Sequence, residues 1–206
     1  MRCVRCLRWY AAASALRCSH LNRALALLGG TMELPTFKYH PDPIKTGAVE
    51  VTDENCECCG VSRGYRATST IYSEHDVETI CPWCISDGSA AKKFDGEFAD
   101  PHPLMKAGLD KSVVKEVCER TPSYISWQQE VWLSHCGDAC EFHGDAEKSD
   151  LLQVKDAELE ALLNDQLIGS NEWHQIVTYY EKGGNPAIYK FKCRSCGIFT
   201  YSLDFA

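Results

Sequence analysis

The sequence predicts an α+β protein: a small zinc-stapled fold with an N-terminal treble-clef-like finger, central helices and a C-terminal zinc-ribbon-like β-hairpin. Three observations support this fold class. Two Cys-x-x-Cys pairs lie about 20 residues apart near the start of the main body, stretches with helical periodicity follow them, and two alternating segments flank a Cys-Arg-Ser-Cys-Gly turn at the end. Paired cysteines on tight turns can direct four sulfurs at one tetrahedral ion.

Composition and charge narrow the class of protein. Of the 206 residues, 45% are hydrophobic and 24% are charged, as in globular domains. The first 31 residues contain five of the 21 Lys and Arg and none of the 29 Asp and Glu, so the rest carries a net charge of −13. So acidic a body lacks the clustered basic groups that nucleic-acid binding needs. Apolar runs long enough for a membrane span are also missing from the sequence.

Residues 1–31 differ in character from the rest of the chain. They are rich in Arg, Ala and Leu, and we expect a disordered or spurious N-terminal extension, with Met32 as a plausible true start. Residues 32–206 are expected to form a single globular domain. The chain has 13 cysteines, an odd number, and no convincing secretory signal. These features favour reduced, metal-binding thiols and a cytoplasmic location over a disulfide framework.

The finger is predicted over residues 54–95. Its four zinc ligands come from the two closely spaced pairs: Cys56, Cys59, Cys81 and Cys84. The alternation over 65–72 and the apolar run 77–80 predict a hairpin between the pairs. A helix is expected to begin at Ser86 or Asp87, where its N-terminus would favour a negatively charged tetrathiolate. Cys58 is interpreted as a bystander.

Helices and aromatic residues dominate the part between 110 and 182. Asp110 is a predicted N-cap for a helix to Arg120, after a proline- and glycine-containing loop over 95–109. Two further helices are expected over 156–168 and 171–181, from their apolar stripes and their terminal glycines. The segment 121–143 holds four aromatic residues, which indicate core packing more than a ligand groove.

A second zinc site is predicted where the C-terminal hairpin, residues 187–204, turns. Its four ligands are expected to be Cys136, Cys140, Cys193 and Cys196. His135 or His143 could replace one thiolate and give a set of three cysteines and one histidine. Such a site would clamp the aromatic segment to the hairpin, and both zinc ions would be structural because four protein ligands leave no position open for water.

Three kinds of function remain open at this point. The first is a zinc-stabilised binding or adaptor module with an unidentified protein partner, contacting it through the aromatic segment. The second is an enzyme, hydrolase-like, with a pocket beside the finger, for which Asp87, Asp95, Glu97 and His102 are candidates by position. The third is a thiol-disulfide oxidoreductase, because Cys81-Pro-Trp-Cys84 has the form of a redox dithiol; the second Cys-x-x-Cys nearby argues against it.

Several stretches resemble the CbrC family of bacterial proteins. They are LPTFKYHPDPIKTG (34–47), CECCG (56–60), CPWCISDGSAAKKFDGEF (81–98), TPSYISWQQEVWLSHCGDACEFHGD (121–145) and KFKCRSCG (190–197). The resemblance covers 32–206 and excludes the basic extension. It implies a cytosolic zinc-binding protein, and it raises the possibility of a role in colicin or stress tolerance, since the family is named for a member with that phenotype.

Overall fold

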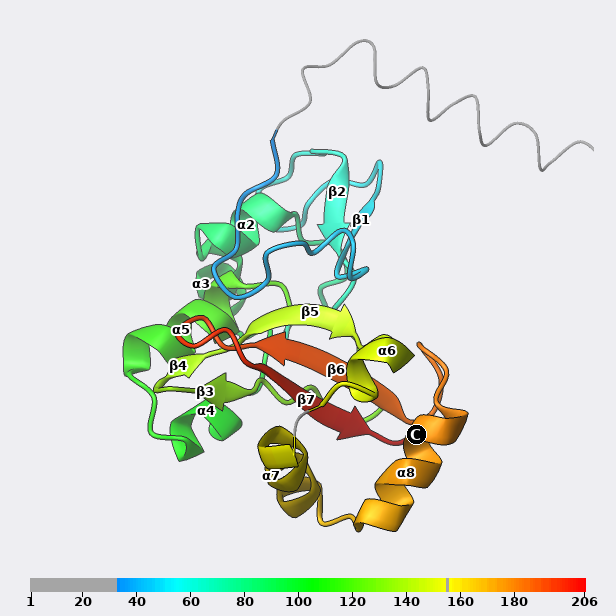
Figure 1. The fold of residues 1–206 in the computed structure, drawn as a ribbon. Coiled ribbons are helices and arrows are strands. Elements are labelled where there is room, and N and C mark those ends of the chain that lie inside the picture. The colour runs from blue at the N-terminus through cyan, green and yellow to red at the C-terminus, as the bar shows by residue number, and fades with distance from the viewer. Residues whose placement is uncertain (1–32, 155) are drawn as a thin grey trace, which may run out of the picture. The chain divides into compact units, whose positions relative to one another are not determined.

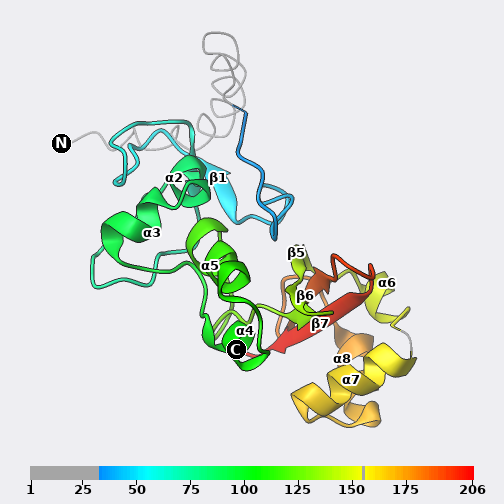
Figure 2. The same cartoon turned by 90° about the vertical axis from the view of Figure 1, so that its left-hand side faces the viewer.

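The structure is a computed structural model that describes residues 33–154 and 156–206 (Figures 1 and 2). The predicted extension 1–31 and the start at Met32 lie outside these residues. Leu34–Ala206 forms one unit, which is described below. Within it an extended arm leads into the fold, and Phe37 and Tyr39 anchor the arm with side chains only 5% and 0% exposed.

The finger region contains two short strands and two short helices. Strands β1 (Val49–Val51) and β2 (Tyr65–Ala67) pair in antiparallel register, and helices α2 (Pro82–Ser86) and α3 (Ser89–Phe94) follow. The predicted hairpin between 65–72 and 77–80 is wrong. Instead, β2 pairs with β1, and residues 77–80 form no strand. Their one backbone hydrogen bond to β2 among the described residues runs from Ala67 N to Ile80 O, at 2.9 Å.

The helix after the second cysteine pair also begins earlier than expected. Cys81 is the N-cap of α2 and Pro82 occupies the first turn, where its fixed φ and missing N–H suit a helix start. Gly88, with a φ of 76°, then separates α2 from α3. Cys84 therefore lies inside a helix, and not before one.

In the middle of the chain, the observed helices agree more closely with those predicted from the sequence. Helix α5 (Lys111–Arg120) begins after Asp110, whose side chain accepts a hydrogen bond from Ser112 N at 2.8 Å, as predicted. The segment predicted as a loop contains a short helix, α4 (His102–Lys106), with Pro103 in its first turn. Val117 and Cys118 of α5 are buried and face the core.

The C-terminal half is built on a three-stranded antiparallel sheet. Its order is β5 (Glu141–Asp145), β6 (Ala187–Lys192) and β7 (Phe199–Asp204), so the predicted terminal hairpin is present and an unpredicted strand joins it. Helices α7 (Asp156–Gln166) and α8 (Ser170–Tyr179) lie together beside the sheet in both views, with α6 (Lys148–Leu151) at its end (Figures 1 and 2). A short hairpin precedes β5, and its two strands, β3 (Ser134–His135) and β4 (Asp138–Ala139), have two residues each.

The aromatic segment forms the centre of the main core. The rings of Tyr124 and Phe142 stack with centroids 4.2 Å apart, and Trp132 packs edge-on against Phe191 of β6 at 5.9 Å. The exception is Trp127, which is 55% exposed. The core interpretation of this segment is therefore confirmed. In the part of the chain that the structure describes, no helix combines the length and apolar composition required to cross a bilayer.

Candidate metal centres

The first cysteine cluster brings two distant turns of the finger together. The sulfurs of its four residues all lie within 4.8 Å of one another: Cys56, Cys59, Cys81 and Cys84. Tetrahedral zinc with bonds of about 2.3 Å separates its sulfurs by about 3.8 Å. The distance from Cys59 Sγ to Cys81 Sγ, 4.0 Å, is close to that value.

Local backbone geometry positions both pairs. In the first pair, Gly60 N donates to Cys56 O at 2.7 Å, and Gly60 has a φ of 74°, which closes a tight turn around the sulfurs. In the second pair, the start of α2 directs Cys81 and Cys84 towards the same point. Cys81 N donates to Cys56 Sγ at 3.2 Å, which links the two turns directly.

Hydrogen bonding within the cluster stabilises thiolate character. The thiol of Cys81 and nearby backbone N–H groups hydrogen-bond to Cys56 and lower its pKa to about 4. The same shared hydrogen bond, together with burial, raises the pKa of Cys81. Burial raises the pKa of Cys84 to about 12. Protons thus remain on part of the set, and a divalent cation would displace them on binding.

A fifth thiol lies beside this cluster without joining it. Cys58 is partly buried, and its Sγ lies 3.6 Å from Ser89 Oγ at the start of α3. The four-residue cluster does not include it. Its position agrees with the interpretation of Cys58 as a bystander.

The second cluster differs from the predicted set in one ligand. Its four residues, again within 4.8 Å of one another, are His135, Cys136, Cys193 and Cys196. His135 Nδ1 lies 3.2 Å from Cys136 Sγ and 3.4 Å from Cys196 Sγ. For tetrahedral zinc an N–S separation of about 3.5 Å is expected from the usual bond lengths.

Cys140, which the sequence predicted as a ligand, lies outside this cluster. It is fully buried in the main core, and its carbonyl oxygen accepts a hydrogen bond from Trp132 Nε1 at 2.9 Å. The reason is the β3–β4 hairpin, whose turn places Cys136 and Gly137 at φ values of 51° and 74°. His135 and Cys136 thereby occupy the hairpin tip, whereas Cys140 follows β4 into the core.

The other histidine that the sequence left open, His143, also lies outside the cluster. It belongs to β5, where its Nε2 lies 3.4 Å from Glu141 Oε2. The imidazole donor in the cluster is therefore His135, one of the two alternatives that the residue pattern left open.

The knuckle between β6 and β7 supplies the remaining two sulfurs. Cys193 N donates to Ile198 O at 2.8 Å, Gly197 N donates to Cys193 O at 2.9 Å, and Cys196 N donates to Cys193 Sγ at 3.5 Å. Burial raises the pKa of Cys193, but the hydrogen bonds from Cys196 N and from His135 outweigh it and bring the pKa to about 6. The lowered pKa favours the thiolate form of Cys193, which is the form that binds a metal ion.

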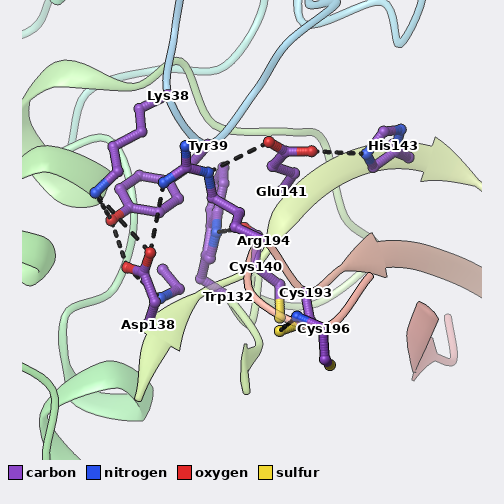
Figure 3. A network of polar contacts seen from close by, with 11 residues as sticks. Lys38, Tyr39, Trp132, Asp138, Cys140, Glu141, His143, Cys193, Arg194 and Cys196 are labelled. Atoms are coloured by element: carbon purple, nitrogen blue, oxygen red, sulfur yellow. Dashed lines mark hydrogen bonds and ion pairs between the residues drawn. The ribbon is translucent and has the colours of Figure 1, made fainter. Parts of the chain in front are cut away.

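A polar network holds this knuckle against the β3–β4 hairpin (Figure 3). Arg194 lies between the two knuckle cysteines and forms ion pairs with Asp138 of β4, at 3.5 Å, and with Glu141 of β5, at 3.3 Å. Tyr39 of the arm donates its hydroxyl to Asp138 Oδ1 at 2.6 Å, and Lys38 lies 3.9 Å from the same carboxylate. Groups outside a ligand set that fix its orientation raise metal affinity.

The two clusters differ in exposure. In the first, only Cys59 is exposed, whereas Cys136 and Cys196 of the second are both exposed. Both offer four soft or imidazole ligands, the donor set of structural zinc. The cysteines of the described residues are all free thiols.

Three of the four residues proposed for an enzyme share one cavity. Asp87, Asp95 and Glu97 line a hollow of about 590 Å³ beside α3 and α5, and His102 lies elsewhere, at the start of α4. Burial and the nearby Glu119 and Asp100 raise the pKa of Glu97.

The fold and the two sites together define the class of protein. It is a mixed α/β protein with small sheets and two cysteine-rich clusters that could each hold a metal ion. Residues 34–205 match the family described as "Uncharacterised protein family (UPF0167)", and the chain belongs to that family. No solved structure matches the chain.

Relatives of the same family occur in Pseudomonas and Mycobacterium species. The chain is 47% identical over 174 residues to a UPF0167 protein of Pseudomonas aeruginosa, a match that covers 84% of this chain and 97% of the relative. It is 38% identical over 180 residues to UPF0167 proteins of Mycobacterium bovis and Mycobacterium tuberculosis, covering 84% of this chain and 95% of each relative. These descriptions state no activity, and the expected link to colicin tolerance finds no support in them.

Proposed function

We propose that this chain is a zinc protein with two structural sites, built as a treble-clef-like finger and a zinc-ribbon-like knuckle, that acts as a cytoplasmic binding module. The observation that carries the proposal is the pair of four-ligand clusters, one of four cysteines and one of three cysteines and a histidine. Saturated sets of this kind leave zinc no open position for a catalytic water. Their role is to hold together segments that are far apart in the sequence.

Each cluster joins two parts of the fold. The first ties the turn after the arm to α2, and the second ties the β3–β4 hairpin to the knuckle of the main sheet. Since metal binding of this kind contributes directly to folding free energy, both ions would stabilise the surfaces that a partner contacts. The exposed Ile125, Trp127 and Val131, which follow one another closely in the aromatic segment, support such a contact surface.

Metal content tests this proposal. We expect about two zinc ions per chain by mass spectrometry of the full-length protein, in the ratio that two four-ligand sites require. Cys136→Ser should leave one, and Cys59→Ser should leave one at most. A preparation with a single ion that Cys136→Ser does not alter would remove the second site, and iron in place of zinc would overturn the choice of metal.

The redox alternative is not favoured by the geometry. A catalytic dithiol needs an accessible first cysteine with a lowered pKa. Cys81 is only 1% exposed, and its shared hydrogen bond with Cys56 together with burial raises its pKa. Reduction of insulin disulfides by the zinc-loaded protein would contradict this assignment.

A second candidate function is an enzyme that uses the cavity beside α3 and α5. The observation in its favour is the convergence of Asp87, Asp95 and Glu97 on that cavity, where the pKa of Glu97 is raised. Raised carboxyl pKa values in a hollow are typical of acid–base sites. Screening the wild type and Glu97→Gln against a panel of ester and phosphoester substrates separates the two candidates: turnover that Glu97→Gln abolishes supports the enzyme.

A further inference from the structure

The second cluster exposes two of its cysteines to solvent, whereas the first exposes one. Cys136 and Cys196 are exposed, and Cys193 beside them is 1% exposed. Cys196 also lines a surface cavity of about 330 Å³, from which a small molecule can approach it. In the first cluster Cys59 is exposed, and the other three cysteines are at most 3% exposed. A dissolved reagent can therefore meet two sulfurs of one cluster but only one of the other.

The two exposed sulfurs lie close together although they come from different turns. Cys136 occupies the tip of the β3–β4 hairpin, and Cys196 belongs to the knuckle between β6 and β7. Both sulfurs surround His135 Nδ1, at 3.2 and 3.4 Å, and they lie within 4.8 Å of one another. A disulfide requires a separation of about 2 Å, so the gap to be closed is at most about 3 Å.

Cys193 is a less suitable partner for either exposed sulfur. It is packed into the main core, and Cys196 N donates a hydrogen bond to its Sγ at 3.5 Å. Forming a bond with Cys196 would require Cys193 to leave its place in that core. Cys136 and Cys196, whose side chains are exposed, can move towards each other without such a loss. The pair across the two turns is therefore favoured over the pair within the knuckle.

Bound zinc would hold both exposed sulfurs in their reactive form. A cysteine binds zinc as a thiolate, and the thiolate is also the form that peroxides oxidise. Susceptibility to oxidation then follows exposure, because the sulfurs of both clusters share this charge state. The oxidation described next rests on the zinc occupancy proposed above.

We propose that the second cluster is an oxidation site, at which a peroxide converts Cys136 and Cys196 into a disulfide and releases the zinc ion. One thiolate attacks a peroxide oxygen, so that an S–O bond forms, the O–O bond breaks and hydroxide leaves. The other thiolate attacks the sulfur of this sulfenic acid, so that the S–S bond forms, the S–O bond breaks and a second hydroxide leaves. The two sulfurs give two electrons to the peroxide, and protons from solvent convert both hydroxides to water.

This disulfide would replace the cross-link that the metal provides. Only His135 and Cys193 would remain as ligands, too few for a structural zinc site. The new bond joins the same two turns, however, and a disulfide that closes a long stretch of chain restricts the unfolded state. The oxidised protein therefore loses one metal ion but keeps the hairpin attached to the knuckle. Because the disulfide is exposed, a thiol reductant can reach it and reverse the change.

The test uses the full-length, zinc-loaded protein and an equimolar amount of hydrogen peroxide. A chromophoric chelator follows the release of zinc. The remaining thiols are then alkylated, and mass spectrometry of unreduced peptides identifies the disulfide. We expect one zinc ion per chain to be released together with a Cys136–Cys196 disulfide, and the ion of the first cluster to be lost about tenfold more slowly or less readily still. Dithiothreitol with added zinc should restore the starting state.

Two variants serve as matched controls. Cys140→Ser changes a buried thiol near the cluster but outside it, so it should give the same zinc release and the same disulfide. Cys136→Ser should lack the same zinc ion as the oxidised wild type but cannot form the cross-link. The oxidised wild type should therefore melt at a higher temperature than Cys136→Ser.

Four results would overturn the proposal. They are a Cys193–Cys196 disulfide as the main product, sulfinic or sulfonic acid at Cys136 without a disulfide, equally fast loss of both ions, and melting of the oxidised protein no higher than that of Cys136→Ser. Zinc content before oxidation tests the proposed function separately. A second cluster without zinc would contradict that function, while the identity of the disulfide would still decide whether Cys136 and Cys196 form the oxidation site.

Discussion

The guanidinium of Arg194 lies 3.5 Å from the carboxylate of Asp138, and this ion pair joins the two halves of the second metal cluster. Arg194 stands between Cys193 and Cys196 in the knuckle, and Asp138 follows the tip of the β3–β4 hairpin, which carries His135 and Cys136. The contact between Arg194 and Asp138, drawn in Figure 3, therefore holds the two ligand-bearing turns together without involving the ligands themselves.

Replacing Arg194 should loosen the second site. Arg194→Ala removes both the pair with Asp138 and the pair with Glu141. Partly exposed ion pairs contribute about 0.2–1 kcal/mol each, so we expect zinc transfer to a chromophoric chelator to become about two- to tenfold faster for one of the two ions. Arg194→Lys, which keeps the charge but not the forked geometry, should lie in between. An unchanged release rate in Arg194→Ala would exclude this role.

The ligand set of the second site can be tested with a matched pair of variants. Cys136→Ser removes a residue of the cluster, whereas Cys140→Ser changes a buried thiol that lies outside it. We expect Cys136→Ser to bind about one zinc ion fewer, in keeping with the loss of a thiolate ligand, and Cys140→Ser to retain both. His135→Ala should behave like Cys136→Ser. Loss of zinc from Cys140→Ser, with retention in His135→Ala, would restore the set predicted from the sequence.

The first site should be essential for folding of the finger. Cys59→Ser removes a ligand at an exposed position, and its neighbour Cys58→Ser serves as the control. Structural zinc in small finger domains contributes about 10 kcal/mol or more of apparent binding free energy at neutral pH. We therefore expect Cys59→Ser to lose one zinc ion and the cooperative melting transition of the finger. Cys58→Ser should melt as the wild type does; equal damage in both variants would mean that Cys58 also binds metal.

His40 should make stability depend on pH. It is fully buried, its ring packs edge-on against Phe142 at 5.0 Å, and its nitrogens lie 2.8 Å from Pro122 O and 2.6 Å from Thr46 Oγ1. Burial lowers its pKa to about 4, outweighing the hydrogen bond to Pro122 O; His143 lowers it slightly and Asp42 raises it slightly.

The direction of this pH dependence follows from whether the folded or the unfolded protein binds the proton more tightly. The unfolded chain takes up this proton near pH 6.5 and the folded protein only near pH 4, so the stability that neutral His40 contributes is complete above pH 6.5 and is lost as the pH falls towards 4. The span corresponds to about 3 kcal/mol. In urea unfolding at pH 7, 6 and 5, the free energy of unfolding should fall less in His40→Gln than in the wild type, because the variant lacks the titrating imidazole. The metal sites are the same in both proteins, so their own pH dependence cancels in the comparison. Parallel curves would contradict the assignment.

Gly96 should tolerate no side chain. A Cβ at this position would lie 2.6 Å from the backbone oxygen of Tyr72, where the two segments exchange backbone hydrogen bonds between Tyr72 and Glu97. We expect Gly96→Ala to lower the free energy of unfolding by about 1–3 kcal/mol, as overpacking does. Gly169→Ala is the control, because its Cβ would meet nothing within 4 Å. Thermal melts of both variants decide the comparison, and an unaltered melting temperature in Gly96→Ala would refute it.

Local patterns predicted part of this fold well. Helix α5 begins after the capping Asp110, and the terminal strands flank the Cys193 knuckle, because a cap and a knuckle are encoded within a few residues. The prediction of a hairpin over 65–80 was wrong because strand pairing depends on residues that lie far apart in the chain. Strand β2 meets β1, which lies in an earlier part of the chain, and alternation within a segment does not reveal its pairing partner.

By itself the sequence determined the four cysteine pairs or near-pairs, the acidic body and the elements with strong local signals, since each depends on residues close together in the chain. Only the tertiary structure decided that His135 replaces Cys140 in the second cluster. A tight turn with positive φ at Cys136 places His135 at the hairpin tip, whereas Cys140 lies in the core. It also brought Arg194 of the knuckle into ion pairs with Asp138 and Glu141. Such convergence arises from packing between distant segments, which spacing along the chain does not encode.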